Sequence, residues 1–336
     1  MPVYNGDAYL EEAIASVLHQ TFRDFECIIV NDGSTDGTGA ILESYEKADP
    51  RIRIYHQENK GMIAALNLGC RAARGKYIAR MDADDVCYPR RLEKQLQRIE
   101  QDPQVGVLGT WISNVRNGVA VGEWRPPTSS MMLKWTHFFG VCVSHPTVLI
   151  RREILEKLDF YREGTVHVED VDLWLRASSI TDFGNVPEVL LKYRTWPGNV
   201  THTHREFARA AHVKLLASFI GDFLKITPRM EAVAGLRQSR VGPPPSTLRQ
   251  IRLTADLLNL LYRAFLKNHE PDGDDRREIS RDAAKRMGSL AIQASRIDAR
   301  ASVPLFLRAL QMDPRLLAPS AIGKGLKRRV SSELDW

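Results

Sequence analysis

Short hydrophobic runs alternate with amphipathic stretches through the first hundred residues of the chain. Apolar runs, or apolar residues at every second position, predict three strands at 25–30, 51–56 and 76–81. Apolar positions three or four residues apart predict helices between them, at 7–20, 38–48 and 61–73. Strands that alternate with helices in this way predict an α/β domain with a mainly parallel sheet and helices on both of its faces.

The middle of the chain has a different pattern, in which short strand-like segments predominate. The dipeptide Asn117-Gly118 lies between two apolar stretches and predicts a hairpin. A strand is predicted over 143–150, and a helix is predicted to begin close to Glu169-Asp170. These segments complete the α/β domain that we expect over residues 1–204.

Helical spacing of apolar residues dominates the remainder of the chain, so we expect a mainly helical region over residues 205–336. Consecutive prolines predict a linker near 241–247 within it. The polar stretch 270–277 predicts an exposed charged loop.

The overall composition, with 43% hydrophobic and 26% charged residues, is that of a globular protein and excludes collagen-like, disordered and disulfide-scaffold classes. No apolar run approaches the roughly 18 residues that a membrane span requires, and no basic segment typical of an export signal follows Met1. The four cysteines form no CxxC pair; Cys27 and Cys142 lie in apolar runs and are predicted to be core residues. This usage favours the reducing cytoplasm.

Charge is distributed unevenly along a chain whose formal net charge is +6. Residues 1–204 carry 23 basic and 27 acidic residues, whereas residues 205–336 carry 24 and 14, which gives net charges of −4 and +10. The second region could therefore rest on the anionic inner face of a membrane, and its densest basic cluster is Lys324, Lys327, Arg328 and Arg329. A merely soluble helical appendage is an equally good interpretation, and no motif indicates nucleic-acid binding.

The most distinctive polar segment is Asp82-Ala83-Asp84-Asp85, which directly follows a predicted strand. Alternate residues of an extended segment point to the same side, so Asp82 and Asp84 could converge on one divalent cation. Such triplets also occur by chance on solvated loops. The position at the end of a buried strand favours a site for Mg²⁺ or Mn²⁺.

A second polar cluster joins the first residues to the loop at 31–36. The ring of Tyr4 could stack on a nucleobase, and the carboxylate of Asp32 could accept a hydrogen bond from a pyrimidine N–H. Taken alone, this loop is more simply explained as a strand-to-helix connection in which Asp36 caps the next helix.

Five segments of the chain follow one another in the order and spacing of a known family. They are Met-Pro-Val-Tyr-Asn-Gly at 1–6, Val-Asn-Asp-Gly-Ser-Thr-Asp-Gly-Thr at 30–38, Asn-Lys-Gly at 59–61, Ala-Arg-Gly-Lys-Tyr-Ile-Ala at 73–79 and Met-Asp-Ala-Asp-Asp at 81–85. Over roughly residues 1–200 the chain thereby resembles family 2 glycosyltransferases. The resemblance implies the GT-A nucleotide-diphospho-sugar transferase fold, a Rossmann-like, mainly parallel sheet flanked by helices, here with a C-terminal helical extension.

The resemblance also implies a role for particular residues. The implied nucleotide-binding residues are Pro2, Val3, Tyr4, Asn5, Asp32, Lys60, Gly61, Asp82 and Ala83. The implied metal ligands are Asp84 and Asp82. The implied catalytic residues are Asp170, as general base, and the adjacent Glu169. Segments 145–152 and 169–176 resemble acceptor-side segments, which suggests His145 and Trp174 as acceptor contacts or as supports behind them.

The resemblance implies an inverting, metal-dependent, hexosyltransferase-type enzyme. Its donor would be a UDP- or dTDP-sugar, and its acceptor a hydroxyl of a glycan or lipid-linked molecule in cell-envelope or exopolysaccharide biosynthesis. The expected location is the cytoplasm or the inner face of the membrane.

The sequence departs from the family pattern at two points, and the first of them leaves an alternative open. Family members have a hydrophobic strand before the Pro-Val-Tyr-Asn segment, whereas this sequence starts at that segment, so the first strand is expected to be missing and the next strand to have an unpaired edge. Many relatives also have a histidine near the position of Trp196, for which His202 or His204 could substitute. The alternative is a catalytically impaired nucleotide-sugar-binding or scaffold protein of a glycan assembly complex.

Overall fold

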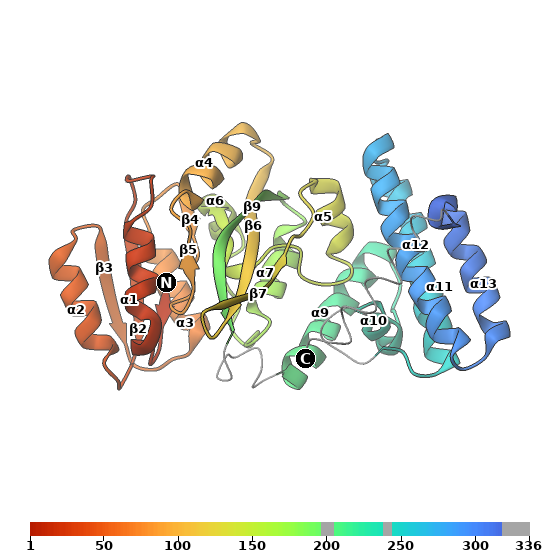
Figure 1. Ribbon diagram of the computed structural model, residues 1–336, viewed down its shortest axis with the longest axis horizontal. Coiled ribbons are helices and arrows are strands. Elements are labelled where there is room, and N and C mark those ends of the chain that lie inside the picture. Colours follow the sequence, from red (N-terminus) through yellow and green to blue (C-terminus); the bar gives the residue numbers. More distant parts are fainter. Residues whose placement is uncertain (196–204, 238–243, 318–336) are drawn as a thin grey trace. The chain divides into compact units, whose positions relative to one another are not determined.

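The computed structural model describes residues 1–195, 205–237 and 244–317. Contacts between residues divide the chain into two units, Met1–His212 and Val213–Trp336. The division falls within helix α9 (Arg205–Leu224), close to the predicted domain boundary (Figure 1). Residues 244–247 of the predicted linker and the helices that follow belong to the second unit, and residues 241–243 lie outside the described residues.

The first unit begins with a three-stranded parallel sheet in the order β1-β2-β3. Its strands are β1 (Pro2–Val3), β2 (Cys27–Asp32) and β3 (Ile52–Gln57). The connecting helices are α1 (Asp7–Leu18), α2 (Thr38–Ala48) and α3 (Met62–Ala72). All six residues of β2 are buried: Leu10, Ile14 and Leu42 cover one face of this sheet, and Ala65 of α3 packs on the other. The parallel pairing predicted from the alternating pattern is present here.

A six-stranded mixed sheet forms the other half of the unit, with the order β4-β8-β6-β9-β5 and β7 paired to β6. Its strands are β4 (Tyr77–Ala79), β5 (Val86–Cys87), β6 (Val105–Arg116), β7 (Val119–Trp124), β8 (Leu149–Arg151) and β9 (Asp182–Thr195). The long central pair β6–β9 is parallel, and the other pairs are antiparallel. The helical segments around it are α4 (Arg91–Gln101), α5 (Ser130–Thr136), η1 (His145–Thr147), α6 (Arg152–Lys157) and α7 (Glu169–Ala177).

The predicted hairpin is confirmed, whereas the strand predicted over 143–150 is wrong for most of its length. Asn117 and Gly118 have φ angles of +50° and +78° between β6 and β7, as a two-residue hairpin turn requires. Within 143–150, Pro146 has no N–H to donate to a neighbouring strand. The Thr147 N–H donates instead to the Ser144 carbonyl at 2.9 Å. A 3₁₀ turn therefore precedes the short strand β8.

Buried aromatic and aliphatic side chains hold helix α7 against the mixed sheet. Trp174 packs edge-on to Phe183 of β9, with ring centroids 6.1 Å apart, in a cluster that also includes Val107 of β6. Cys142 belongs to the same cluster, and both Cys27 and Cys142 are buried free thiols, which confirms the prediction of core cysteines. Burial raises the pKa of Cys27 to about 11, so this thiol stays protonated at neutral pH. The packed core fixes the position of the first turn of α7.

The described residues of the second unit are mainly helical. After the shared helix α9 it contains α10 (Met230–Leu236), α11 (Leu248–His269), α12 (Gly273–Ser295), α13 (Ala299–Met312) and η2 (Pro314–Leu317). No helix among the described residues has the length and apolar character needed to cross a membrane. The predicted basic membrane contact at 324–329 lies outside the described residues.

The prediction of an exposed charged loop over 270–277 is wrong beyond Asp272. The Asp272 side chain accepts hydrogen bonds from the backbone N–H groups of Asp274 and Asp275, both at 2.9 Å. This N-cap, with acidic residues in the first turn, favours the start of α12 at Gly273. The polar run that indicated a loop is the beginning of a helix.

Candidate active site

Three carboxylates gather in the segment that follows β4. Oxygen atoms of Asp82, Asp84 and Asp85 lie within 4.8 Å of one another. Asp82 and Asp84 are half-buried, and Asp85 is almost completely buried. Burial, followed by the charges of Asp82 and Asp84, raises the pKa of Asp85 well above its ordinary value. The cluster therefore carries a concentration of negative charge that the folded chain must offset.

The buried guanidinium of Arg80 supplies part of that offset. One of its amino groups donates to a carboxylate oxygen of Asp82 at 2.5 Å. Burial lowers the pKa of Arg80, but the charges of Asp82, Tyr161 and Asp85 more than compensate, and the net shift is upward. Arg80 is thus a fixed cation beside the acidic cluster.

Strand β9 contributes a further contact to the cluster at its last residues. The backbone N–H of Arg194 donates to one carboxylate oxygen of Asp85 at 2.9 Å. The other Asp85 oxygen is buried, and no hydrogen-bond partner for it lies among the described residues. An oxygen without a partner in a buried acidic cluster is suited to an additional donor or a cation.

This donor set fits a hard divalent cation. Carboxylate oxygens are the ligands that Mg²⁺ and Mn²⁺ prefer, and the three carboxylates provide both the proximity and the charge. The partnerless oxygen of Asp85 is a coordination position that no described side chain takes up. The sequence indicated only Asp82 and Asp84 as ligands, and the structure adds Asp85 as a candidate.

The adjacent acidic residues Glu169 and Asp170 lie in the first turn of α7. Glu169 is buried, and Asp170 is half-buried and accepts from the Val171 N–H at 2.7 Å. Burial, followed by the charge of Asp170, raises the pKa of Glu169 to about 7. Burial also raises the pKa of Asp170, which the positive charge of Arg80 opposes. The charge of Asp82 contributes to both upward shifts, so the α7 pair lies within electrostatic range of the acidic cluster.

His145 and Trp174 are both buried beside this pair. The His145 Nε2 atom is 2.8 Å from the Tyr161 hydroxyl, and its ring meets the ring of Trp174 edge-on at 5.7 Å. Burial, with the nearby charge of Arg80, lowers the pKa of His145 well below its ordinary value, so the imidazole is neutral. These contacts place the His145 ring against Trp174, a residue of α7 that belongs to the buried core.

The carboxylate of Asp32, at the carboxyl end of β2, organises the loop after β3. Its Oδ1 atom accepts from the Gln57 side chain at 2.6 Å and from the Lys60 N–H at 2.8 Å. Its Oδ2 atom accepts from the Gly61 N–H at 2.9 Å, where Gly61 has a φ of +87°. The predicted nucleotide-binding residues Asp32, Lys60 and Gly61 are therefore joined directly.

The first residues of the chain are joined to the neighbouring loop in the same way. Asn5 has a φ of +48°, donates its N–H to the Ser34 hydroxyl and accepts from the Thr35 N–H, at 2.9 and 2.8 Å. Pro2 and Val3 pair with Val30 and Asn31 of β2, and the exposed ring of Tyr4 follows them. Ala83 packs against the apolar cluster that contains Val3. This apolar contact connects the N-terminal segment to the acidic cluster.

The predicted site residues thus form two connected groups. One group surrounds Asp32 at the end of β2, and the other joins the acidic cluster to the first turn of α7. Sequence reasoning missed the roles of Arg80 and Asp85. Arg80 directly precedes Met81-Asp82. A basic residue next to an acidic run is the signal that could have predicted a counter-charge to the acidic cluster. Trp196, His202 and His204 lie outside the described residues.

The raised pKa of Glu169 predicts a pH-dependent contribution to stability. The folded chain retains this proton between the ordinary pKa of 4.5 and about 7, whereas the unfolded chain releases it. Stability therefore falls as pH rises through this window, by at most about 3 kcal/mol. We expect Glu169→Gln to make this fall smaller, while the raised pKa values of Asp85 and Asp170 keep part of it; the measurement is denaturant unfolding at pH 5 and pH 8 in metal-free buffer.

The matched control is Glu153→Gln, which removes an exposed acidic residue from the first turn of α6. It should keep the difference in stability between the two pH values found for the unchanged chain. An identical pH dependence in the Glu169→Gln variant would contradict the assignment of a raised pKa to Glu169.

The fold and the acidic site together define a class, the glycosyltransferases with the GT-A fold. Two solved structures share this fold at low sequence identity. Staphylococcus aureus TarS (residues 1–349, in complex with UDP-GlcNAc) has a TM-score of 0.56 and 16% identity, over 92% of this chain and 89% of that one. The mannosyltransferase PcManGT from Pyrobaculum calidifontis, in complex with GDP-Man and Mn²⁺, has a TM-score of 0.52 and 17% identity, over 91% and 85%.

Comparisons of the sequence with known proteins identify the family within this class. The model of glycosyl transferase family 2 matches residues 1–159. An uncharacterized glycosyltransferase of Methanocaldococcus jannaschii is 36% identical over 200 residues, covering 58% of this chain and 69% of the relative. The O-antigen biosynthesis glycosyltransferase WbnJ of Escherichia coli is 35% identical over 199 residues, covering 58% and 77%. The chain belongs to glycosyltransferase family 2.

Proposed function

We propose that this glycosyltransferase is a metal-dependent, inverting enzyme that moves a sugar from a UDP- or dTDP-sugar to the hydroxyl of a glycan or lipid-linked acceptor. The observation that carries the proposal is the convergence of the Asp82, Asp84 and Asp85 carboxylates, with the acidic first turn of α7 within electrostatic range of them. The carboxylate cluster suits a cation and a leaving diphosphate, and the first turn of α7 suits a proton acceptor.

The acidic cluster would hold the divalent cation through Asp82, Asp84 and Asp85. A bound Mg²⁺ or Mn²⁺ supplies charge stabilisation to a leaving diphosphate. Arg80 keeps Asp82 in place through their ion pair and neutralises part of the cluster. A structural neighbour solved with GDP-Man and Mn²⁺ is consistent with this metal chemistry.

The group around Asp32 would hold the nucleoside. The exposed ring of Tyr4 offers a face for stacking on a base, and the remaining lone pairs of the Asp32 carboxylate could accept from a pyrimidine N–H. Pro2, Val3 and Asn5 would form one wall of this pocket, and the loop at Lys60 and Gly61 the other. The TarS complex with UDP-GlcNAc supports a uridine diphosphate donor.

Asp170 would act as the general base. It is half-buried, and its raised pKa makes it a better proton acceptor than an ordinary aspartate. As the acceptor oxygen bonds to the anomeric carbon, its proton passes to the Asp170 carboxylate and the bond from that carbon to the diphosphate breaks. Attack opposite the leaving group inverts the anomeric centre.

The acceptor class follows from a relative and from the charge distribution. WbnJ is named for O-antigen biosynthesis, and this name supports a glycan acceptor for the chain. The net charge of +10 over residues 205–336 supports contact with an anionic membrane surface, and thus an enzyme at the inner face of the membrane.

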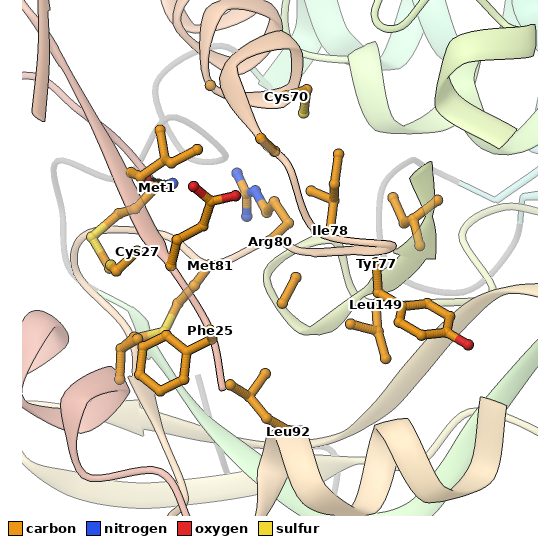
Figure 2. Close-up of a pocket in the computed structure, with 18 of the residues that line it drawn as sticks. Met1, Phe25, Cys27, Cys70, Tyr77, Ile78, Arg80, Met81, Leu92 and Leu149 are labelled. Atoms are coloured by element: carbon orange, nitrogen blue, oxygen red, sulfur yellow. Dashed lines mark hydrogen bonds between the residues drawn. The ribbon is translucent and has the colours of Figure 1, made fainter. Parts of the chain in front are cut away.

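One observation favours the alternative of a catalytically impaired donor-binding protein. A cavity of about 890 Å³ borders β2 and is lined by Met1 and Pro2, at the start of the segment that would line the nucleotide pocket (Figure 2). A nucleotide pocket that borders such a cavity could bind a donor without holding it in the exact position that sugar transfer requires.

A donor screen distinguishes the two functions. The purified chain is incubated with Mn²⁺ or Mg²⁺ and a panel of UDP-, dTDP- and GDP-sugars, while nucleotide binding and release of free nucleotide are measured separately. We expect metal-dependent release from a uridine or thymidine diphosphate sugar. Binding without release, in the presence of a membrane-lipid and glycan extract as acceptor, would favour the impaired protein. Absence of both would contradict the proposal.

A further inference from the structure

An exposed apolar patch lies beside the start of α7. Val166 is 47% exposed, and Phe207 in the first turn of α9 is 62% exposed. The rings of His167 and Phe207 meet edge-on, with centroids 6.2 Å apart. We name these three residues the Phe207 patch; all of them belong to the first unit. Exposed apolar side chains that gather at one place on a surface are typical of a binding site.

The loop 162–167, which carries the first two residues of the patch, is anchored at both ends. Before it, the backbone N–H and carbonyl of the buried Tyr161 bond to the side-chain amide of Asn67 on α3, at 3.0 and 2.9 Å. After it, the N–H of the buried Val168 donates to the Thr165 carbonyl at 2.9 Å. These contacts hold the loop in one conformation where it enters α7.

Left-handed backbone conformations are concentrated in this part of the chain. Seven non-glycine residues among the described ones have a positive φ, and three of them lie within 159–167. These are Asp159, Phe160 and His167, with φ angles of +50°, +59° and +68°. Such conformations are costly, and they cluster at binding and catalytic sites. The conformation of His167 is therefore an indication of function that is independent of the exposure of its neighbours.

The patch is within reach of the proposed general base. His167 is three residues from Asp170, and a chain of that length spans at most about 11 Å. Asp170 is half-buried in the first turn of α7, so part of this residue is open to solvent. A short saccharide in contact with Phe207 could therefore place one of its hydroxyls at the Asp170 carboxylate.

The chemistry of the patch suits a sugar ring. One face of a pyranose presents C–H groups, and its rim presents hydroxyls. The face of an aromatic ring is negative and attracts C–H groups, while the imidazole of His167 and the carboxylate of Asp170 offer polar atoms to the rim. Ligand sites commonly combine aromatic surface with a few polar groups in this way. An alkyl chain would contact the apolar surface but would gain nothing from the polar groups beside it.

We infer that the Phe207 patch is an acceptor subsite, in which a pyranose ring of the acceptor packs its C–H face on the ring of Phe207 and thereby presents a hydroxyl to Asp170. The edge contact with His167 holds the Phe207 ring in place. The presentation to Asp170 rests on the proposed function, whereas the binding of a sugar ring by Phe207 does not. The inference names a sugar, and not a lipid chain, as the part of the acceptor that this site holds.

The test uses probes that contain both a sugar ring and an alkyl chain. These are the hexyl glycosides of glucose, galactose, mannose and N-acetylglucosamine. Saturation-transfer NMR with the full chain shows which protons of each probe touch the protein, and titration gives the Kd. The titrations are made without nucleotide and metal, and they are repeated with UDP and Mn²⁺.

Three substitutions of Phe207 separate an aromatic contact from a simple apolar one. Phe207→Ala removes the ring, Phe207→Leu keeps apolar volume without an aromatic face, and Phe207→Trp keeps such a face. The matched control is Phe306→Ala, which removes a phenylalanine that is 41% exposed on α13. All four variants change exposed side chains and should fold, which their melting temperatures check.

We expect saturation of the sugar-ring protons of at least one glycoside in the unchanged chain. The Kd of that glycoside should rise about tenfold in Phe207→Ala and Phe207→Leu, and should stay within about threefold in Phe207→Trp. Phe306→Ala should leave it unchanged.

Three results would overturn the inference: no glycoside binds under either condition, only the alkyl chain receives saturation, or the affinity is the same in Phe207→Ala or Phe207→Leu as in the unchanged chain. Sugar binding that depends on the Phe207 ring upholds the subsite even if the donor screen fails. Sugar binding that does not depend on it, together with normal donor release, overturns the subsite alone and leaves the proposed function standing.

Discussion

Asp84→Ala is expected to abolish sugar transfer, with a loss of at least about 10³-fold in kcat/KM, and to weaken metal-dependent nucleotide binding. The oxygen of Asp84 lies within 4.8 Å of those of Asp82 and Asp85, so its removal takes away one of three converging carboxylates. A fixed group that stabilises a developing negative charge commonly raises the rate by about 10²–10³-fold. Loss of the cation would remove more than one such stabilising contact. Transfer is measured by release of free nucleotide, and binding by calorimetry with and without Mn²⁺.

The control for this substitution is Glu43→Ala. The Glu43 side chain is 66% exposed on α2, where it forms a surface ion pair with Lys47, and surface pairs contribute little. Its variant should transfer sugar at the unchanged rate. If Asp84→Ala also retains the full rate, the acidic cluster is not the metal site.

Asp170→Asn should stop transfer while it leaves donor binding intact. Asparagine keeps the shape of the side chain but cannot accept the acceptor proton, and loss of a general base typically costs about 10²–10⁴-fold in rate. The expected result is a fall in kcat of that size with an unchanged Kd for the nucleotide. A simultaneous loss of donor binding would argue against the base role.

The competing explanation for the acidic start of α7 is structural. Acidic residues near a helix N-terminus contribute about 0.3–1 kcal/mol to stability through the helix dipole. Glu153→Gln tests this explanation, because it removes an acidic residue from the first turn of α6. If the role of Asp170 is only structural, both variants should lose a similar, small amount of stability and should transfer sugar normally.

Local patterns predicted much of the first unit. Alternating strands and helices indicated the sheet β1-β2-β3, the dipeptide Asn117-Gly118 indicated the hairpin, and Glu169-Asp170 indicated the start of α7. In each case neighbouring residues determine the backbone conformation, through apolar spacing, positive φ angles or a favourable first turn. The same signals could not show that β6 and β9 pair in parallel, because strand order depends on contacts between segments that are distant in the sequence.

Side-chain contacts within the site were also beyond the reach of local patterns. Asp32 was predicted as a base contact, but its bonds to the backbone of Lys60 and Gly61 depend on how the loop after β3 folds back. The Asp85 contact with Arg194 joins residues 109 positions apart. The burial of Arg80 depends on elements that only the folded chain brings together.

The hydrogen bonds of Asp32 have an energetic consequence for donor recognition. Two backbone amides and the Gln57 side chain already orient this carboxylate before any nucleotide arrives. In the proposed donor complex, Asp32 loses little conformational entropy on binding because folding has already ordered its side chain. More of the free energy of its contact with the base therefore contributes to affinity. The same hydrogen bonds fix the orientation of the Asp32 carboxylate. A purine could not be accommodated by rotation of this acceptor, so the selectivity for a pyrimidine would be strict.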